Sequence, residues 1–209
     1  MRVSIIGAGD RQYHFGELLG MDDGIVDQHL EEIAEALAKN RAEVVLLPDR
    51  GVCVDLARHY RQSGGISVIA TVPLKDEMFG ISHLQPYREE VFAQGPLFTE
   101  TVDTGSWFQQ DAIITLLGDV VLMLGVTLGS LQELTFGLYL YKLFVGQKGG
   151  IEIARDCVHP QIRAGESFRV LCYRPFMRGP LNEEIEAYAT KIGVEIIYID
   201  DAQQLADYL

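Results

Sequence analysis

Hydrophobic residues along the chain alternate between short β-branched runs and longer stretches with helical spacing. The short runs predict strands over residues 2–6, 43–47, 66–72, 120–124, 168–173 and 194–199, most of which end at glycine, proline or aspartate. Apolar residues recur at helical spacing over residues 27–39, 52–62, 106–117, 130–145 and 181–192, and a short helix is predicted to end the chain at residue 209. Residues 10–26 and 74–104 have no clear period, so we expect irregular, loop-rich segments there.

Strands that alternate with helices predict a parallel sheet covered on both faces. Because crossovers between parallel strands are right-handed, the sequence predicts an α/β fold, a single doubly wound, Rossmann-like domain over residues 1–209 with a mostly parallel sheet. The composition agrees, since 48% of the residues are hydrophobic and 22% are charged, which is typical of a packed globular protein.

The net charge of the chain argues against negatively charged macromolecular partners. Seventeen lysines and arginines against 30 aspartates and glutamates leave a net charge of −13, which repels nucleic-acid backbones and anionic membranes. We therefore expect neither as a partner. A small anionic ligand stays compatible with this charge if backbone N–H groups supply its site.

One apolar stretch, residues 120–145, is long enough to span a membrane. Against that interpretation, Glu133 would lie near mid-membrane at a cost of roughly 2.5–3.5 kcal/mol. Glycines and polar residues at 125–130 also divide the run. We therefore expect a buried strand, a glycine turn and a buried helix.

The number and spacing of the cysteines indicate the redox state of the protein's compartment. Cys53, Cys157 and Cys172 are an odd number without CxxC spacing, and residues 2–6 lead directly into glycines rather than into a long apolar signal segment. These features favour a reducing cytoplasm. Cys157 and His159 are capable of binding a metal, but no second pair with zinc spacing lies nearby. We expect no metal site and no cofactor.

Two glycine-bearing turns follow the first two predicted strands, at the edge where parallel sheets bind ligands. Gly7 and Gly9 would let the backbone approach a ligand closely, and Arg11 could pair with a phosphate. This turn lacks the third glycine of the GxGxxG dinucleotide fingerprint and could simply end the strand. Arg50 and Gly51 form the second turn, directly before a helix.

The third turn, residues 125–133 (GVTLGSLQE), contains Gly125 and Thr127 and leads from a strand into a helix. Gly129 and Ser130 would expose backbone N–H groups at the helix N-terminus, where the dipole favours a phosphate, and the Ser130 hydroxyl would add a donor. Glu133 could reach a ribose hydroxyl or a reacting sugar carbon. It could also complete a capping box with Ser130, and the two roles are compatible.

Residues 129–133 (GSLQE) resemble the end of the PGGxGTxxE motif of the lysine-decarboxylase-like, or Lonely Guy, phosphoribohydrolases. Residues 51–57 (GVCVDLA) are similar to the GLMGxVA segment of that family, and residues 64–73 (GGISVIATVP) to its GGxVIGVxP strand. Order and spacing agree from residue 1 to about residue 145. The family cleaves the N-glycosidic bond of nucleoside 5′-monophosphates. The resemblance implies that Gly129 and Ser130 hold the phosphate, and that Glu133 is catalytic, binding ribose and stabilising an oxocarbenium-like transition state.

Two positions depart from the family pattern. Residues 125–127 (GVT) stand where the motif has Pro-Gly-Gly, and the β-branched Val126 disfavours a positive φ. Counting back from Asp119 gives Gln110 and Asp111 where the family has an Arg-Lys pair, and no arginine or lysine occurs between Arg88 and Lys142. The catalytic arginine is therefore missing, whereas the phosphate cradle is largely intact.

We therefore predict that the chain binds a nucleotide or a similar phosphorylated small molecule at the carboxyl ends of the strands. Two alternatives remain, a phosphoribohydrolase in which Arg11 or Arg50 replaces the missing arginine, and a carrier like the molybdenum-cofactor carriers that resemble this superfamily. The expected ligand-binding residues are Gly7, Gly9, Arg11, Arg50, Gly51, Gln110, Gly125, Thr127, Gly129 and Ser130. Residues 131–145 are apolar on more than one helix face, which, with the resemblance, predicts a homodimer or a higher homo-oligomer.

Overall fold

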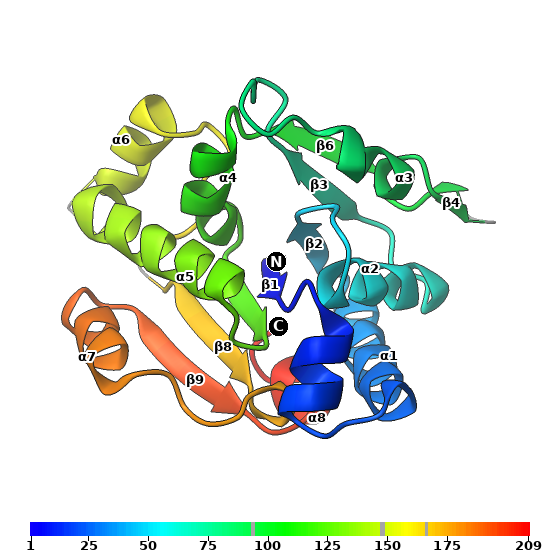
Figure 1. The fold of residues 1–209 in the computed structure, drawn as a ribbon. Coiled ribbons are helices and arrows are strands. Elements are labelled where there is room, and N and C mark those ends of the chain that lie inside the picture. Colours follow the sequence, from blue (N-terminus) through cyan, green and yellow to red (C-terminus); the bar gives the residue numbers. More distant parts are fainter. Residues whose placement is uncertain (93–94, 147–148, 166) are drawn as a thin grey trace.

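A seven-stranded parallel sheet forms the centre of the computed structural model, which describes residues 1–92, 95–146, 149–165 and 167–209. The strands lie in the order β6-β3-β2-β1-β7-β8-β9 (Figure 1). Their bounds are β1 (Arg2–Gly7), β2 (Glu43–Leu46), β3 (Val68–Val72), β6 (Glu100–Asp103), β7 (Val120–Leu124), β8 (Arg169–Tyr173) and β9 (Glu195–Ile199). The predicted Rossmann-like α/β fold with a parallel sheet is confirmed.

Helices cover both faces of this sheet, as Figure 1 shows. One face is packed by α1 (Asp23–Lys39), α2 (Val52–Gln62) and α8 (Ala202–Ala206), and the other by α4 (Trp107–Ile113), α5 (Leu128–Leu140), α6 (Gly150–Cys157) and α7 (Glu183–Lys191). Successive side chains of a strand enter opposite layers of the core, so that Ile5 packs in the first layer and Ile6 in the second. Both residues are 1% exposed.

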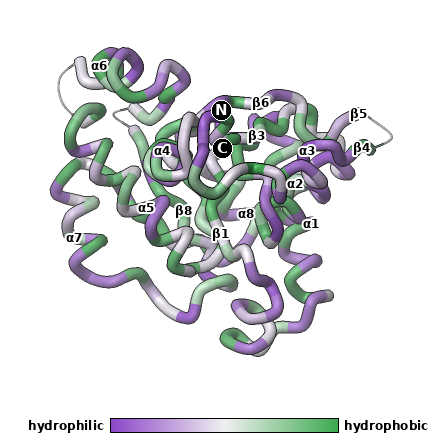
Figure 2. The backbone as a smooth tube through the Cα atoms, turned by 45° about the horizontal axis from the view of Figure 1, so that its top comes forward, coloured by the Kyte–Doolittle hydropathy of each residue, from purple (hydrophilic) through white to green (hydrophobic). Residues whose placement is uncertain are grey.

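The central strands are mainly hydrophobic because helices cover them on both sides. All five residues of β3 and all five of β7 are buried. In Figure 2 the central strands are mainly in the hydrophobic colour, whereas α1 and α2 alternate between the two colours along their length. Each of these helices thus presents an apolar stripe to the sheet and a polar one to solvent.

The segment 74–104 contains more structure than its sequence predicts. It holds η2 (Ser82–Leu84), the short helix α3 (Gln85–Arg88), the two-stranded pair β4 (Val91–Phe92) and β5 (Gly95–Pro96), and the edge strand β6. β6 pairs with β3, although Val102 is its one buried residue. An edge strand with a single buried side chain has no hydrophobic alternation, which explains why the pattern missed it. Residues 93–94 of this segment lie outside the described residues.

The first residue of a helix differs from the prediction where a capping side chain sets the first turn. α1 begins at Asp23 rather than at residue 27, because the Asp22 side chain accepts a hydrogen bond from the Ile25 N–H at 2.9 Å. Asn182 and Asp201 cap α7 and α8. Within 10–26, predicted to be irregular, lies the π-helix η1 (Gln12–Leu18).

The apolar stretch 120–145 is divided as its glycines predict. It forms β7, a turn, α5 and the π-helical end η4 (Tyr141–Val145). Likewise, the segment 106–117 forms α4 and the 3₁₀ turn η3 (Ile114–Leu117). Over the described ranges, no helix has both the length and the apolar character that crossing a membrane requires.

Candidate functional site

The order of the strands reverses between β1 and β7. From β1 the chain moves outward through β2 and β3 to β6, and it then returns to place β7 on the other side of β1. The two strands pair directly, and Gly7 lies opposite Leu124 at their carboxyl ends. The loops that follow β1 and β7 lead to opposite faces of the sheet, which opens a crevice of the kind where doubly wound folds bind ligands.

A cleft of about 500 Å³ lies at this point, within the usual size range of small-molecule sites. Five segments line it, namely the end of β1 with the following turn and η1, the turn after β2, Cys53 of α2, the turn after β7 with the start of α5, and Asp111 of α4. Of the residues predicted for the site, the cleft brings together Gly7, Gly9, Arg50, Thr127, Gly129, Ser130 and Glu133. It also includes residues that were not predicted, among them Asp10, Tyr13, His14, Asp49, Cys53 and Asp111.

Glycines after β1 and β2 let two backbones touch at the floor of the cleft. A Cβ atom on Gly7 would lie 2.6 Å from Val52 Cγ1, and one on Gly51, whose φ is +98°, would lie 2.4 Å from the Ala8 carbonyl oxygen. The Val52 N–H also donates to that carbonyl at 3.0 Å. Gly51 therefore shapes the Gly7–Gly9 turn from behind rather than lining the cleft.

The start of α5 differs from the prediction. Its N-cap is Thr127, whose Oγ1 accepts a hydrogen bond from the Ser130 N–H at 3.2 Å. Ser130 Oγ in turn accepts from the Thr127 N–H at 2.9 Å and donates to the Gly125 carbonyl at 3.0 Å. The capping box thus joins Thr127 to Ser130, and the expected box of Ser130 with Glu133 is wrong because the helix begins earlier.

This correction changes which groups face a ligand. The Ser130 side chain is 1% exposed and occupied in holding the loop, so its hydroxyl is not a spare donor. Leu128 and Gly129 occupy the first turn, are exposed, and line the cleft. Their N–H groups have no acceptor within the helix, because the first turn of any α-helix leaves its N–H groups unpaired. At Gly125 a Cβ atom would lie 2.6 Å from His14 Nε2, so this glycine is needed for the turn.

Two carboxyl groups lie together in the cleft. Glu133 is half-buried, and its burial together with the nearby Asp111 raises its pKa to about 8. Burial also raises the pKa of Asp111 to about 6. The Gln132 side chain donates to Asp111 Oδ2 at 2.6 Å and so holds that carboxyl group across from α5. The sequence comparison pointed to position 111 only as the place of a family lysine, and it did not identify Asp111 as a site residue.

Arg50 supplies the positive charge of the cleft. Arg50 is exposed. Among the described residues that line the cleft, it is the one arginine. Over the described part of the chain, its guanidinium forms no ion pair with a carboxylate.

Arg11 and Gln110 are placed elsewhere. The Arg11 guanidinium forms ion pairs with Asp55 at 2.8 Å, Asp27 at 2.9 Å and Asp23 at 3.4 Å. Gln110 is fully buried, where it donates to Thr71 Oγ1 at 2.8 Å and accepts from Thr104 Oγ1 at 2.7 Å. Neither residue belongs to the described lining of the cleft.

Two further reactive side chains line the cleft, the thiol of Cys53 and the imidazole of His14. Burial and the charges of Glu133 and Asp55 raise the pKa of the Cys53 thiol well above its ordinary value, so this thiol is a poor nucleophile. His14 Nε2 donates to the Phe176 carbonyl at 3.0 Å. Within the described residues, no group of three or more His, Cys, Asp or Glu side chains is arranged to hold a metal ion.

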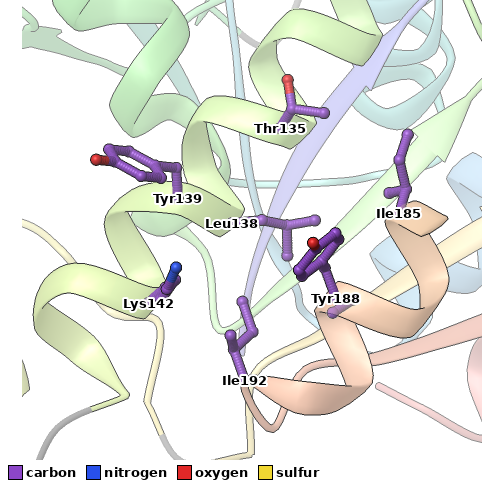
Figure 3. Close-up of a pocket in the computed structure, with 8 residues that line it drawn as sticks. Thr135, Leu138, Tyr139, Lys142, Ile185, Tyr188 and Ile192 are labelled. Carbon is purple, nitrogen blue, oxygen red and sulfur yellow. The ribbon is translucent and has the colours of Figure 1, made fainter.

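A second, apolar cavity of about 220 Å³ lies between α5 and α7. Figure 3 shows Leu138 of α5 facing Tyr188 of α7 and Ile192, which directly follows that helix. Tyr139 and Tyr188 are more than half exposed beside it, at 58% and 64%. Among the described residues that line it, Lys142 is the one basic residue.

No family model and no curated protein sequence matches the chain. Among solved structures, the molybdenum cofactor binding protein of Rippkaea orientalis aligns with a TM-score of 0.56 and 13% identity over 99% of this chain and 93% of that one. The molybdenum cofactor carrier protein of Chlamydomonas reinhardtii aligns with a TM-score of 0.57 and 11% identity, over 99% and 94%. A structure named TM1055 aligns with a TM-score of 0.59 and 18% identity, over 100% and 99%. At these identities the likeness is one of fold, and this chain shares the Rossmann-like fold of these proteins.

Proposed function

We propose that the cleft binds a nucleotide or a similar phosphorylated small molecule, with its phosphate at the start of α5. One observation carries this proposal, namely that a single cleft is lined both by the first-turn residues Leu128 and Gly129 and by the unpaired guanidinium of Arg50. Free N–H groups at a helix N-terminus bind anions, with about 0.3–1 kcal/mol from the dipole at exposed sites. An arginine adds charge-assisted hydrogen bonds to phosphate oxygens.

The local packing leaves room for a phosphate at this position. Gly129 has no side chain to cover the N–H groups, and the nearest atom to a Cβ placed there, Thr127 Oγ1, would be 3.9 Å away. On the opposite wall, Gly7 and Gly9 expose their backbone to the same cleft. The backbone is therefore accessible from both sides of the switch point, as dinucleotide and phosphate sites of doubly wound folds require.

Binding is favoured over hydrolysis by the position of Gln110. The resemblance places a catalytic arginine at this position, and here the residue is a glutamine that is buried and bonded to Thr71 and Thr104. Arg50 would have to serve both the phosphate and the transition state. A carrier role is the second candidate, and the structural neighbours whose names describe molybdenum cofactor binding and carrying favour it.

Calorimetric titration with AMP tests the proposal. We expect measurable binding, and we expect Arg50→Gln to weaken it about 10-fold, because a charge-assisted hydrogen bond contributes about 1.5–3 kcal/mol. Arg178→Gln is the matched control, since Arg178 is an exposed arginine outside the cleft. A protein that binds neither AMP nor any other nucleoside monophosphate, or an Arg50→Gln variant as tight as wild type, would contradict the proposal.

We also propose that the chain forms a homo-oligomer. The surface formed by Phe136, Tyr139, Leu143 and Tyr188 is 41–64% exposed, and it adjoins the apolar cavity between α5 and α7. Exposed apolar surface of this kind is typical of protein interfaces. A second copy of the chain is the proposed partner at this surface.

A further inference from the structure

The cleft contains a carboxyl group without a partner. Gln132 holds Asp111, but Glu133 accepts no hydrogen bond from any described residue. It is half-buried and lines the cleft. A carboxyl group in this position is free to accept hydrogen bonds from a ligand.

Glu133 and the proposed phosphate position lie on one face of α5. Gly129 and Glu133 are four residues apart, so they are neighbours on the helix surface and one turn apart, about 5–6 Å along the axis. A ligand whose phosphate sits at Gly129 therefore extends toward Glu133. Asp111, held by Gln132, approaches the same end of the cleft from α4.

The two ends of the cleft carry groups of different charge. Arg50 and the N–H groups of α5 favour an anion, whereas the carboxyl pair favours hydrogen-bond donors. Burial raises the pKa of Glu133 to about 8 and that of Asp111 to about 6, so the pair carries less than two full negative charges at neutral pH. Gln132 occupies one Asp111 oxygen and leaves the other free to accept.

We infer that Asp111 and Glu133 recognise a nitrogen heterocycle that presents an exocyclic amino group beside a ring N–H, at the end of the ligand opposite its phosphate. The free Asp111 oxygen accepts one of these N–H bonds, and a Glu133 carboxyl oxygen accepts the other. Ribose hydroxyls also donate hydrogen bonds to carboxylates, so the test includes a ligand that lacks them. This inference rests on the proposed function, because it assumes that a phosphorylated ligand occupies the cleft.

GMP and IMP test the inference, because they differ only in the exocyclic amino group. We expect GMP to bind at least 10-fold more tightly than IMP in calorimetric titrations. In Asp111→Asn, the Gln132 amide keeps the Asn oxygen as its acceptor and leaves an NH₂ group facing the ligand. This variant should lose about 10-fold in GMP affinity and bind GMP and IMP within about 2-fold of one another. Its melting temperature checks that it is folded, and Asp156→Asn on the exposed face of α6 is the control.

Each outcome separates the inference from the proposed function. If no nucleotide binds, the proposed function fails and the inference with it. If both nucleotides bind equally to wild type, or if the preference for GMP survives in Asp111→Asn, the inference is wrong and the phosphate site stands. A loss of affinity for 2′,3′-dideoxy-AMP relative to AMP, without any difference between GMP and IMP, would assign the carboxyl pair to ribose and also overturn the inference.

Discussion

A Cβ atom placed on Gly51 would lie 2.6 Å from the Cα atom of Gly9. The start of α2 and the turn after β1 are thus in backbone contact directly behind the cleft. Gly51→Ala must both move this turn and adopt a φ of +98°, and a left-handed conformation alone costs an L-residue roughly 1–2 kcal/mol. We expect the variant to lose about 2–4 kcal/mol of unfolding free energy in urea and to bind AMP more weakly.

Gly64→Ala separates the cost of a positive φ from the cost of the contact with the Gly9 turn. Gly64 has a similar φ of +86°, but no atom lies within 4 Å of a Cβ placed there. This control should lose about 1 kcal/mol, the cost of its backbone conformation, and should keep wild-type affinity. Equal losses of stability in the two variants would show that the contact between Gly51 and Gly9 does not support the turn.

Gly129→Asp should abolish phosphate binding without disturbing the fold. The added carboxylate would lie at the helix N-terminus, where a negative charge suits the dipole but repels the phosphate from the same place. Since the nearest atom to a Cβ on Gly129 is 3.9 Å away, the side chain fits. We expect at least ~30-fold weaker AMP binding, equivalent to about 2 kcal/mol, in calorimetry.

The control for this charge is Gly179→Asp. A Cβ on Gly179 also has no neighbour within 4 Å, and the residue lies outside the cleft lining. Its affinity for AMP should match wild type. If both variants lose affinity equally, the general negative charge of the protein and not the site is responsible.

The main features of the fold could be predicted because they depend on local and repeating signals. β7 is buried along its whole length and is hydrophobic without interruption, so it could be predicted from its composition. β6 has only Val102 buried, and nothing in its sequence distinguishes it from a loop. The glycine turns were expected at the ligand-binding edge of the sheet, and the strand order brings those after β1 and β7 together in the cleft.

The site was predicted less completely, because side-chain partners are set by tertiary contacts. Arg11 is at a suitable position for a phosphate, but Asp55 and Asp27, from two other helices, bind it instead. Ser130 was assigned to the helix start, whereas the Thr127 cap moves that start and leaves Glu133 one turn inside. Asp111 enters the cleft only because α4 packs against α5, which no local pattern reveals.

The raised pKa of Glu133 predicts a pH-dependent stability. Its pKa is about 8 in the folded chain against 4.5 for the free side chain, so between these values the folded state binds more protons than the unfolded state. The free energy of unfolding therefore falls as the pH rises through this interval, and it levels above about pH 8. Glu133→Gln removes this effect and should raise the melting temperature on the order of 5 °C at pH 9 but little at pH 5.

Glu152→Gln on α6 is the reference for this measurement, because Glu152 is exposed. Its melting temperature should follow that of wild type at every pH. A difference between Glu133→Gln and wild type that stays constant from pH 5 to pH 9 would show that Glu133 is ionised over the whole range.

The apolar surface on α5 and α7 predicts self-association. We expect light scattering to show a dimer or a larger homo-oligomer at micromolar concentration. Tyr139→Glu places a charge among Phe136, Leu143 and Tyr188 and should shift the protein toward monomer, since charges are depleted from interface cores. Phe79→Glu changes an equally exposed aromatic residue, at 65%, outside this surface, and should leave the mass unchanged. A monomeric wild-type protein would contradict this prediction.

The last prediction concerns catalysis at the glycosidic bond. Without an arginine at position 110, the transition state lacks a charge-assisted contact, and the loss of one such contact costs about 10²-fold or more in rate. We expect AMP to bind but to release adenine at a weak or undetectable rate, as measured by chromatography of the free base. Gln110→Arg would not restore activity, because position 110 faces Thr71 and Thr104 in the core, where an unpaired charge costs several kcal/mol. That variant should instead lose stability. A wild-type turnover within ~1–10³ s⁻¹ would overturn the preference for binding, and its loss in Arg50→Gln would assign the role of the missing arginine to Arg50.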